Sequence, residues 1–272
     1  MCTQEAWLMT QEEKRVYLLK KLLSELPQFQ KEQNLDTLLP DSEEEQKCLL
    51  RSLMNIRPPR PVSSDFLQLQ DEYLSEEVRR RGMVDGNALP ASPGNSRLVL
   101  WRGDITTLQV DAIVNAANCA LRGCFVPCHS CVDNIIHSAS GIQLRLICDK
   151  LMNEQAHNEP TGTAKLTPAF NLPSRYVLHT VGPIVSGRLT ALHRRQLADC
   201  YRSCLELASQ HDLKSIAFCC ISTGEFHFPQ KEAARIAVQT VSEILQTHTK
   251  PERVIFNVFK QDDYEIYKRL LE

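Results

Sequence analysis

The sequence predicts an α/β fold that follows a helical N-terminal region, and three observations carry this prediction. After Arg97, short apolar runs rich in β-branched residues alternate with longer amphipathic helix patterns. Before residue 82 the chain carries helix patterns and little else. Strands that alternate with helices indicate a mostly parallel or mixed sheet covered on both faces.

The N-terminal helix patterns lie in residues 12–29, 40–59 and 65–81, where apolar residues recur at helical spacing. In the second pattern, Asp41 or Ser42 is the expected N-cap, because acidic residues fill the first turn after it. An amphipathic layer of this kind is typical of an accessory region packed on a main domain.

The segment 82–96 is rich in Gly, Pro, Ser and Asn, which favours a boundary. We therefore expect two units, residues 1–96 as the helical accessory region with its linker and residues 97–272 as the main domain.

Within the main domain, both kinds of element can be read from the hydrophobic pattern. Apolar runs predict strands at 98–101, 111–117, 176–182, 215–222 and 254–259. Amphipathic patterns predict helices at 131–152, 190–210, 229–246 and 262–272. Ligands of such folds bind at loops beyond the carboxyl ends of the strands.

Charge and composition narrow the class of partners. The 272 residues carry 31 basic and 33 acidic side chains, a net charge of -2, so we expect no general nucleic-acid binding and no attraction to anionic membranes. The opening residues lack a signal-peptide pattern, and no segment approaches the roughly 20 apolar residues of a membrane span. We expect a cytoplasmic monomer whose eleven cysteines are reduced thiols or metal ligands.

Two strand-to-helix turns suit a ligand. The run "CCIS" leads into "STGEFHFP", where Gly224 can expose backbone N–H groups beside a helix N-terminus for a phosphate. The run "AIV" leads into "NAAN", which contains Asn115 and Asn118. Each turn taken alone more often has a purely structural role, because Gly permits tight geometry and Asn is a common turn former.

Five ordered motifs together resemble the macrodomain family over residues 97–272: "WRGDITTLQVDAIVNAAN", "DNIIHSASG", "PTGTAKLTPAFNLPSRYVLHTVGP", "ISTGEFHFPQKEAARIA" and "VIFNVFKQDDYEIY". The resemblance implies a three-layer α/β/α sandwich with a mixed sheet and a cleft for ADP-ribose. By position it assigns adenine recognition to Asp104 and Ile105, the distal ribose to Asn118, the diphosphate to Ser222, Thr223, Gly224, Glu225 and Phe226, and the surroundings of adenine to Asn257 and Phe259.

The stretch "GCFVPCHSC" departs from the glycine run of ordinary hydrolytic macrodomains. It resembles the zinc-dependent macrodomain subgroup, which implies one zinc ion per chain bound by Cys124, His129 and Cys131. Two thiolates and an imidazole suit zinc, and three protein ligands leave an open fourth position. Cys128 is not required by the subgroup pattern, and coordination by this residue would close the site.

The resemblance implies a glycosidase-type hydrolase that removes ADP-ribose from mono-ADP-ribosylated protein side chains. Asn118 and Asp133 are the expected catalytic residues, with Asp133 orienting or deprotonating water, although it is also placed as a helix N-cap. His137 is expected to be buried and hydrogen-bonded. The alternatives are an ADP-ribose-binding reader without catalysis, a hydrolase of free ADP-ribose derivatives, and a zinc-stabilised RNA-binding domain.

Overall fold

The N-terminal region is a set of three helices that begin at side-chain caps. The computed structural model describes residues 9–32 and 34–272, and part of the segment searched for a signal peptide, residues 1–8, lies outside this range. The helices are α1 (Gln11–Ser24), α2 (Glu43–Ile56) and α3 (Ser64–Arg81), with short 3₁₀ turns at Pro27–Phe29 and Leu35–Leu38. Ser42, one of the two predicted residues, caps α2 by accepting the Glu45 N–H.

These helices bury a core of their own. Leu19, Leu53 and Phe66 from α1, α2 and α3 pack together in it. The cluster also contains Ile142, the first residue of a helix that belongs to the α/β unit. The apolar stripes predicted from the sequence therefore face one another, and one residue of the α/β unit completes their core.

The α/β unit is built on a six-stranded mixed sheet in the order β2-β8-β7-β4-β6-β5. All neighbouring strands are parallel except β5, which pairs antiparallel with β6 at one edge. The strands are β2 (Leu98–Arg102), β4 (Ala112–Ala117), β5 (Ala164–Pro168), β6 (Tyr176–Val181), β7 (Ser215–Phe218) and β8 (Arg253–Val258). A short parallel pair, β1 (Val84–Asp85) with β3 (Leu108–Gln109), joins the linker to the unit.

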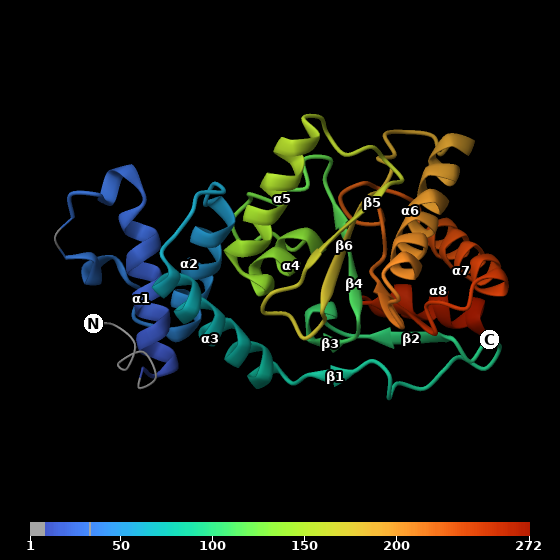
Figure 1. Cartoon of the computed structure of the whole chain (residues 1–272), viewed down its shortest axis with the longest axis horizontal. Helices are drawn as coiled ribbons and strands as arrows, with labels where there is room; N and C mark the ends of the chain where they lie inside the picture. Colours follow the sequence, from blue (N-terminus) through green and yellow to red (C-terminus); the bar gives the residue numbers. More distant parts are fainter. Residues whose placement is uncertain (1–8, 33) are drawn as a thin grey trace.

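Helices cover both faces of the sheet, which confirms the predicted α/β/α sandwich. Figure 1 shows α4 and α5 on one side of the sheet and α6, α7 and α8 on the other. Their bounds are α4 (Val132–Ser140), α5 (Ile142–Gln155), α6 (Ala191–Gln210), α7 (Gln230–Thr247) and α8 (Gln261–Leu271). Because both faces are covered, the central strands are almost wholly buried.

The single helix predicted over residues 131–152 is wrong, since the chain forms two helices there. Gly141 ends α4 and precedes α5 with a φ of 98°, a conformation that favours glycine. The side-chain oxygen of Gln70, on α3, accepts the N–H of Ile142 at 3.0 Å. The N-terminal region thus helps to fix the position at which α4 ends and α5 begins.

The strand β5 was not predicted. Its sequence, Ala-Lys-Leu-Thr-Pro, contains no continuous apolar run and ends in proline. Both features are compatible with a strand at the edge of the sheet, where one side of the strand is unpaired.

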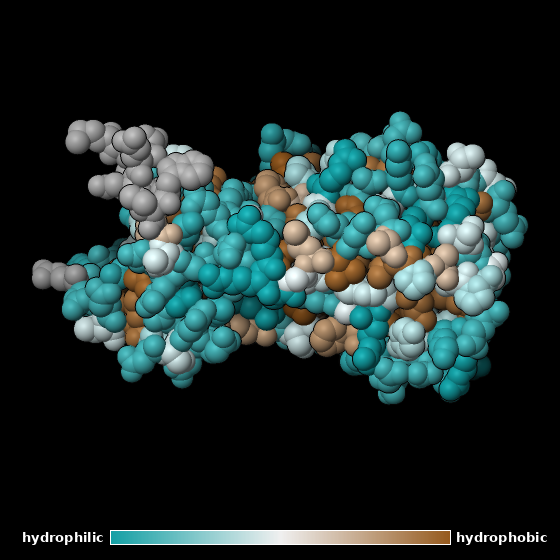
Figure 2. All heavy atoms as spheres, turned by 90° about the horizontal axis from the view of Figure 1, so that it is seen from below, coloured by the Kyte–Doolittle hydropathy of each residue, from teal (hydrophilic) through white to brown (hydrophobic). Residues whose placement is uncertain are grey.

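The surface differs between the two halves of the molecule. Figure 2 shows mostly hydrophilic side chains over the N-terminal helices, while hydrophobic side chains reach this face mainly over the α/β unit. Among the described residues, no helix combines the length and the apolar character that crossing a bilayer requires.

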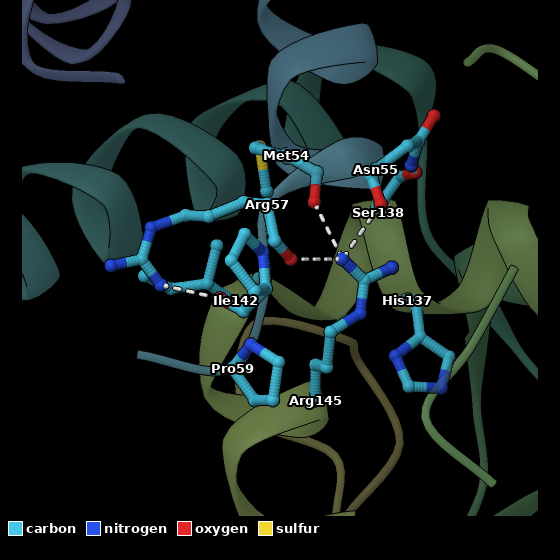
Figure 3. Close-up of a pocket in the computed structure, with 10 residues that line it drawn as sticks. Met54, Asn55, Arg57, Pro59, His137, Ser138, Ile142 and Arg145 are labelled. Atoms are coloured by element: carbon cyan, nitrogen blue, oxygen red, sulfur yellow. Dashed lines mark hydrogen bonds between the residues drawn. The ribbon is translucent and has the colours of Figure 1, made fainter. Parts of the chain in front are cut away.

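Arg145, on α5, is a buried charge at the junction of the two units (Figure 3). One guanidinium nitrogen, Nη1, donates to the carbonyl oxygens of Met54, Asn55 and Arg57 at 3.0, 2.7 and 2.7 Å. These carbonyls end α2, where a cation also interacts favourably with the helix dipole. Burial lowers the pKa of Arg145 to about 10, so the side chain remains charged at neutral pH.

The remaining donors of Arg145 bind carbonyl oxygens of the loop that follows β4. Nε donates to the carbonyl of Arg122 at 2.7 Å, and Nη2 donates to that of Cys124 at 3.3 Å. One guanidinium therefore joins the end of α2 to the loop that follows β4.

We predict that Arg145→Lys lowers the free energy of unfolding by about 2–4 kcal/mol, because an ammonium group cannot reach carbonyls on both sides and leaves several of them unpaired. Urea denaturation measures the change. Arg202→Lys is the matched control, since Arg202 is exposed on α6 and, among the described residues, makes only a local ion pair with Asp199. An equal loss in both variants would contradict the role of Arg145.

Candidate active site

The residues predicted to bind a ligand lie at one edge of the sheet. Asp104 and Ile105 follow β2, Asn257 and Phe259 lie at the end of β8, residues 222–226 follow β7, and Asn118 follows β4. Because β2, β8, β7 and β4 are parallel neighbours in this order, their carboxyl ends form a row. The row spans about 14 Å, three strand spacings.

At the β2 end of the row, Asp104 caps a 3₁₀ turn (Ile105–Thr107). Its Oδ1 accepts the Thr106 N–H at 2.9 Å, and its Oδ2 accepts from Arg81 of α3 at 2.8 Å. Within the described ranges, the Ile105 N–H has no hydrogen-bond acceptor. An oriented carboxylate and a free N–H are the groups that an adenine edge can pair with.

On the neighbouring strand β8, Asn257 is buried and donates to the Gly103 carbonyl at 3.0 Å. Phe259 is 77% exposed at the end of the strand. The first side chain therefore shapes the backbone beside Asp104, and the second offers a free aromatic face.

The loop after β7 contains two residues with left-handed backbone and several free N–H groups. Ser222 and His227 have φ values of 65° and 55°, and the Phe228 N–H donates to the Ser222 carbonyl at 2.9 Å. Between them, the N–H groups of residues 224–226 donate to no acceptor in the described part of the chain. Consecutive unpaired N–H groups shortly before the N-terminus of α7 form an anion-binding arrangement.

Two glycines make room at this loop. A Cβ atom at Gly182 would lie 2.0 Å from the Ser222 hydroxyl oxygen, so the close approach of the two turns requires glycine. A Cβ atom at Gly224 would meet nothing within 4 Å and would face open space. The surface of the loop at Gly224 is therefore free for a ligand.

The two predicted catalytic residues contact each other. The side-chain amide of Asn118 donates to Asp133 Oδ2 at 3.2 Å, and that of Asn115 donates to Asp133 Oδ1 at 2.8 Å. Asp133 is buried in the first turn of α4, whose N-cap is Cys131 rather than Asp133. Burial raises the pKa of Asp133 to about 6, and the two amide hydrogen bonds partly oppose that rise.

His137 is buried as predicted, but the expected hydrogen bond is absent from the described residues. Its Nε2 lies 3.5 Å from Asp133 Oδ1, and neither ring nitrogen has a hydrogen-bond partner among them. Burial holds the pKa of His137 well below its ordinary value, so the ring is neutral. The ring packs on Gly123, where a Cβ atom would lie 2.8 Å from it.

His137 also lies near Cys148 and His179 in a buried group. His179 contacts Asn115 through Nδ1 at 3.2 Å and Thr167 through Nε2 at 3.0 Å. Because both of its ring nitrogens are engaged, this group suits core packing better than a metal ion.

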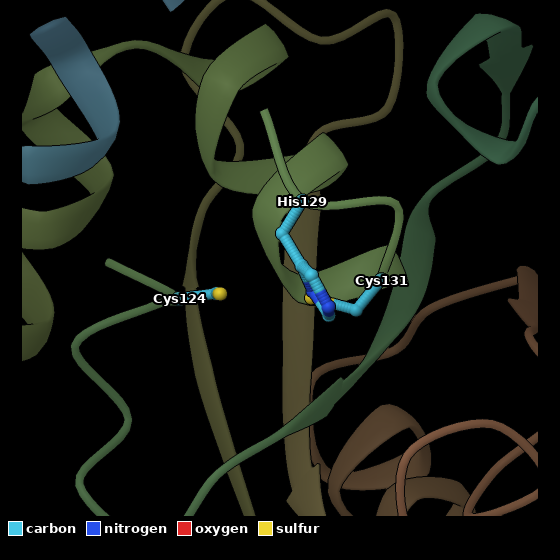
Figure 4. Close-up of side chains that lie close together, drawn as sticks. All are labelled: Cys124, His129 and Cys131. Carbon is cyan, nitrogen blue, oxygen red and sulfur yellow. The ribbon is translucent and has the colours of Figure 1, made fainter. Parts of the chain in front are cut away.

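Cys124, His129 and Cys131 converge beside the Asn118–Asp133 pair, and their donor atoms all lie within 4.8 Å of one another. Figure 4 shows their side chains directed toward a common space. Burial raises the pKa of the Cys131 thiol to about 12, and the neighbouring Cys124 and Asp133 add to the rise. A bound cation would reverse this effect, because metal ligation stabilises the thiolate.

His129 supplies the donor chemistry that a metal site needs. Its Nδ1 is buried and has no hydrogen-bond partner in the described part of the molecule. Its Nε2 lies 3.7 Å from the carboxylate of Glu225, which belongs to the loop after β7. Metal-binding imidazoles commonly hold their second nitrogen near a carboxylate, so the arrangement fits a metal ligand.

Cys128 lies outside this donor group. Its backbone has a φ of 50°, and its sulfur contacts Cys48 and Ser52 of α2 at 3.3 and 3.2 Å. The three-donor set named from the sequence is thus the set that the fold gathers.

The supports of this loop were missed in the sequence. On α2, Arg51 donates to the His129 carbonyl at 2.7 Å and the Asn55 side chain accepts the Cys128 N–H at 2.9 Å. Both residues lie more than 70 positions before the loop residues that they contact, and no local pattern marks such partners. The N-terminal region, expected to be an accessory layer, therefore also holds the loop in place.

Comparisons with known proteins agree with this architecture. The Macro domain family matches residues 114–237. A protein-ADP-ribose hydrolase of Treponema medium is 52% identical over 97% of this chain and 100% of its own length. A protein-ADP-ribose hydrolase of Staphylococcus aureus (strain MRSA252) is 47% identical over 85% of this chain and 86% of its own.

Solved structures are similar as well. The Trypanosoma brucei macrodomain in complex with ADP-ribose is 31% identical, with a TM-score of 0.64 over 81% of this chain and 95% of its own. The Oceanobacillus iheyensis macrodomain with ADP is 39% identical, with a TM-score of 0.57 over 62% of this chain and 87% of its own. With its mixed sheet between helices, a family match over residues 114–237 and a relative that matches 97% of its length, the chain belongs to the macrodomain family.

Proposed function

We propose that this protein is a hydrolase that removes ADP-ribose from ADP-ribosylated protein side chains, and that it does so with one zinc ion per chain. Relatives 46–52% identical over most of the chain carry the name protein-ADP-ribose hydrolase. Hydrolysis of the bond between ADP-ribose and the side chain is a glycosidase-type reaction.

The observation that carries the proposal is the order of groups along the sheet edge. The adenine candidates lie at β2 and β8, the unpaired N–H groups follow β7, and the Asn118–Asp133 pair follows β4 beside the cysteine and histidine donors. ADP-ribose has the same order of adenine, diphosphate and distal ribose. Binding of the nucleotide at one end therefore positions the reacting carbon at the other.

Zinc fits the donor set of Cys124, His129 and Cys131, because two sulfurs and an imidazole are its preferred ligands. Held by three protein ligands, a bound zinc ion would supply Lewis-acid polarisation next to the Asn118–Asp133 pair.

The chain's own residues carry the other tasks. The side chain of Asn118 binds the distal ribose, held by its hydrogen bond to Asp133. Asp133 orients the attacking water and takes its proton, a role suited to a carboxyl group whose pKa is raised toward neutrality by burial. The loop at residues 222–226 binds the diphosphate through backbone N–H groups.

A turnover assay tests the proposal. The zinc-loaded protein should release ADP-ribose from proteins modified on Asp or Glu, on Ser or on Arg, and a chelator should abolish the release. Turnover that is equal with and without zinc would refute a role of the metal in the reaction. Binding of ADP-ribose without turnover on any linkage would favour a module that binds ADP-ribose and does not cleave it.

We predict that Cys131→Ser loses zinc and nearly all turnover but binds ADP-ribose within about tenfold of the parent, or about 1.4 kcal/mol, because the affinity comes from the other strands. Serine remains a good N-cap for α4, so the fold should persist. Elemental analysis and calorimetry measure the two quantities. Cys128→Ser is the matched control and should keep the metal, since Cys128 lies outside the donor group.

Gly224→Glu should lose binding and turnover together. The new side chain faces open space, so it does not clash with the protein, but its charge and bulk occupy the place of the diphosphate. Gly224→Ala, which adds one methyl group at the same position, should bind within a few fold of the parent by calorimetry. Equal affinity of the Glu variant and the parent would place the diphosphate elsewhere.

Asp133→Asn should lower kcat by about 10² to 10⁴ because it removes the proton acceptor while keeping the shape of the side chain. Single-turnover release of ADP-ribose measures the effect, and ADP-ribose affinity serves as the control for an intact cleft. A variant that retains more than a tenth of the parent rate would remove Asp133 from the reaction.

A further inference from the structure

Two thiols from distant parts of the chain meet where α2 contacts the metal loop, residues 122–131. The sulfur of Cys48, exposed on α2, lies 3.3 Å from the sulfur of Cys128, which is half-buried. The residues are 80 positions apart, so tertiary structure alone brings them together. Bonded sulfurs lie about 2.05 Å apart, and an approach of about 1.2 Å would therefore join them.

The structure holds Cys128 in this position. Its N–H donates to the side-chain oxygen of Asn55 at 2.9 Å, and its sulfur contacts the Ser52 hydroxyl at 3.2 Å. Arg51 fixes the next carbonyl, that of His129, at 2.7 Å. Three residues of α2 thus direct the Cys128 sulfur toward Cys48 and away from the metal donors.

Six other described cysteines are less suited to exchange with a dissolved disulfide. Cys148, Cys200, Cys204 and Cys219 are buried, and a disulfide reagent reaches a buried sulfur poorly. Cys124 and Cys131 belong to the donor group with His129. Cys48 therefore combines solvent exposure with a second thiol at contact distance.

We propose that Cys48 and Cys128 are a reversible disulfide site, formed by exchange with a low-molecular-weight disulfide such as glutathione disulfide. The Cys48 thiolate attacks one sulfur of glutathione disulfide and releases one glutathione. The Cys128 thiolate then attacks the Cys48 sulfur of the mixed disulfide and releases the second. Two protein thiols and one glutathione disulfide thus give one protein disulfide and two glutathione thiols.

The bond links the N-terminal region covalently to the metal loop next to His129. It leaves the three donors free, because neither cysteine belongs to their group. This site is independent of the hydrolytic activity and can be tested without a substrate.

Peptide mapping of the full-length, zinc-loaded protein tests the site. After incubation with glutathione disulfide and alkylation of the remaining thiols, a peptide pair linked through Cys48 and Cys128 should be the main disulfide product, and dithiothreitol should remove it. Cys48→Ser should lower the yield of linked Cys128 at least tenfold. Cys119→Ser is the matched control, because Cys119 is also exposed, and should leave the yield unchanged.

Other products would overturn the proposal. Glutathione that stays on Cys48 and is not displaced by Cys128 would show that the two protein sulfurs do not form a bond. Linkage of Cys128 to Cys124 or Cys131 would show that it belongs with the metal donors. Cys48→Ala should lower the yield of disulfide-linked Cys128 as much as Cys48→Ser does. An unchanged yield in either variant would also refute a disulfide between Cys48 and Cys128.

Discussion

The buried guanidinium of Arg145 is the constraint on which the junction of the two units depends. A charged group in a nearly closed environment is tolerated only where its donors are satisfied, and here the acceptors are carbonyl oxygens at the end of α2 and in the metal loop. Neither partner can move away without leaving part of the charge unpaired. The end of α2, the start of α5 and the metal loop therefore occupy one fixed arrangement.

The order of the strands places the candidate ligand-binding groups in a line. Four parallel strands end at the same edge, and each contributes one kind of group: a capped carboxylate after β2, an exposed aromatic ring after β8, free N–H groups after β7 and a hydrogen-bonded Asn–Asp pair after β4. Glu225, in the loop after β7, lies 3.7 Å from His129, so the free N–H groups of that loop lie next to the group of Cys124, His129 and Cys131. The order of the groups thus follows from strand pairing, because each group lies just beyond the end of its own strand or within its last residues.

Much of this arrangement could be predicted from the sequence because it follows short-range rules. The five apolar runs form strands, and the motifs that follow four of them lie together at the carboxyl ends of those strands. The break at Gly141, the edge strand β5 and the supports of the metal loop could not be predicted in this way. Gly141 lies within a continuous helical pattern, β5 is too polar, and Arg51 and Asn55 act through contacts across more than 70 residues. Such contacts depend on the whole fold, so no local periodicity records them.

The position of Ile142 has a consequence for how the molecule opens. This first residue of α5 is buried in the core of the N-terminal helices, while the rest of α5 lies against the α/β unit. Local unfolding of the helical region would strip the start of α5 of its packing, and separation of α5 would in turn expose that core. The two segments therefore support each other, and the Ile142 amide proton, which Gln70 of α3 accepts at 3.0 Å, becomes free to exchange with solvent when that contact opens.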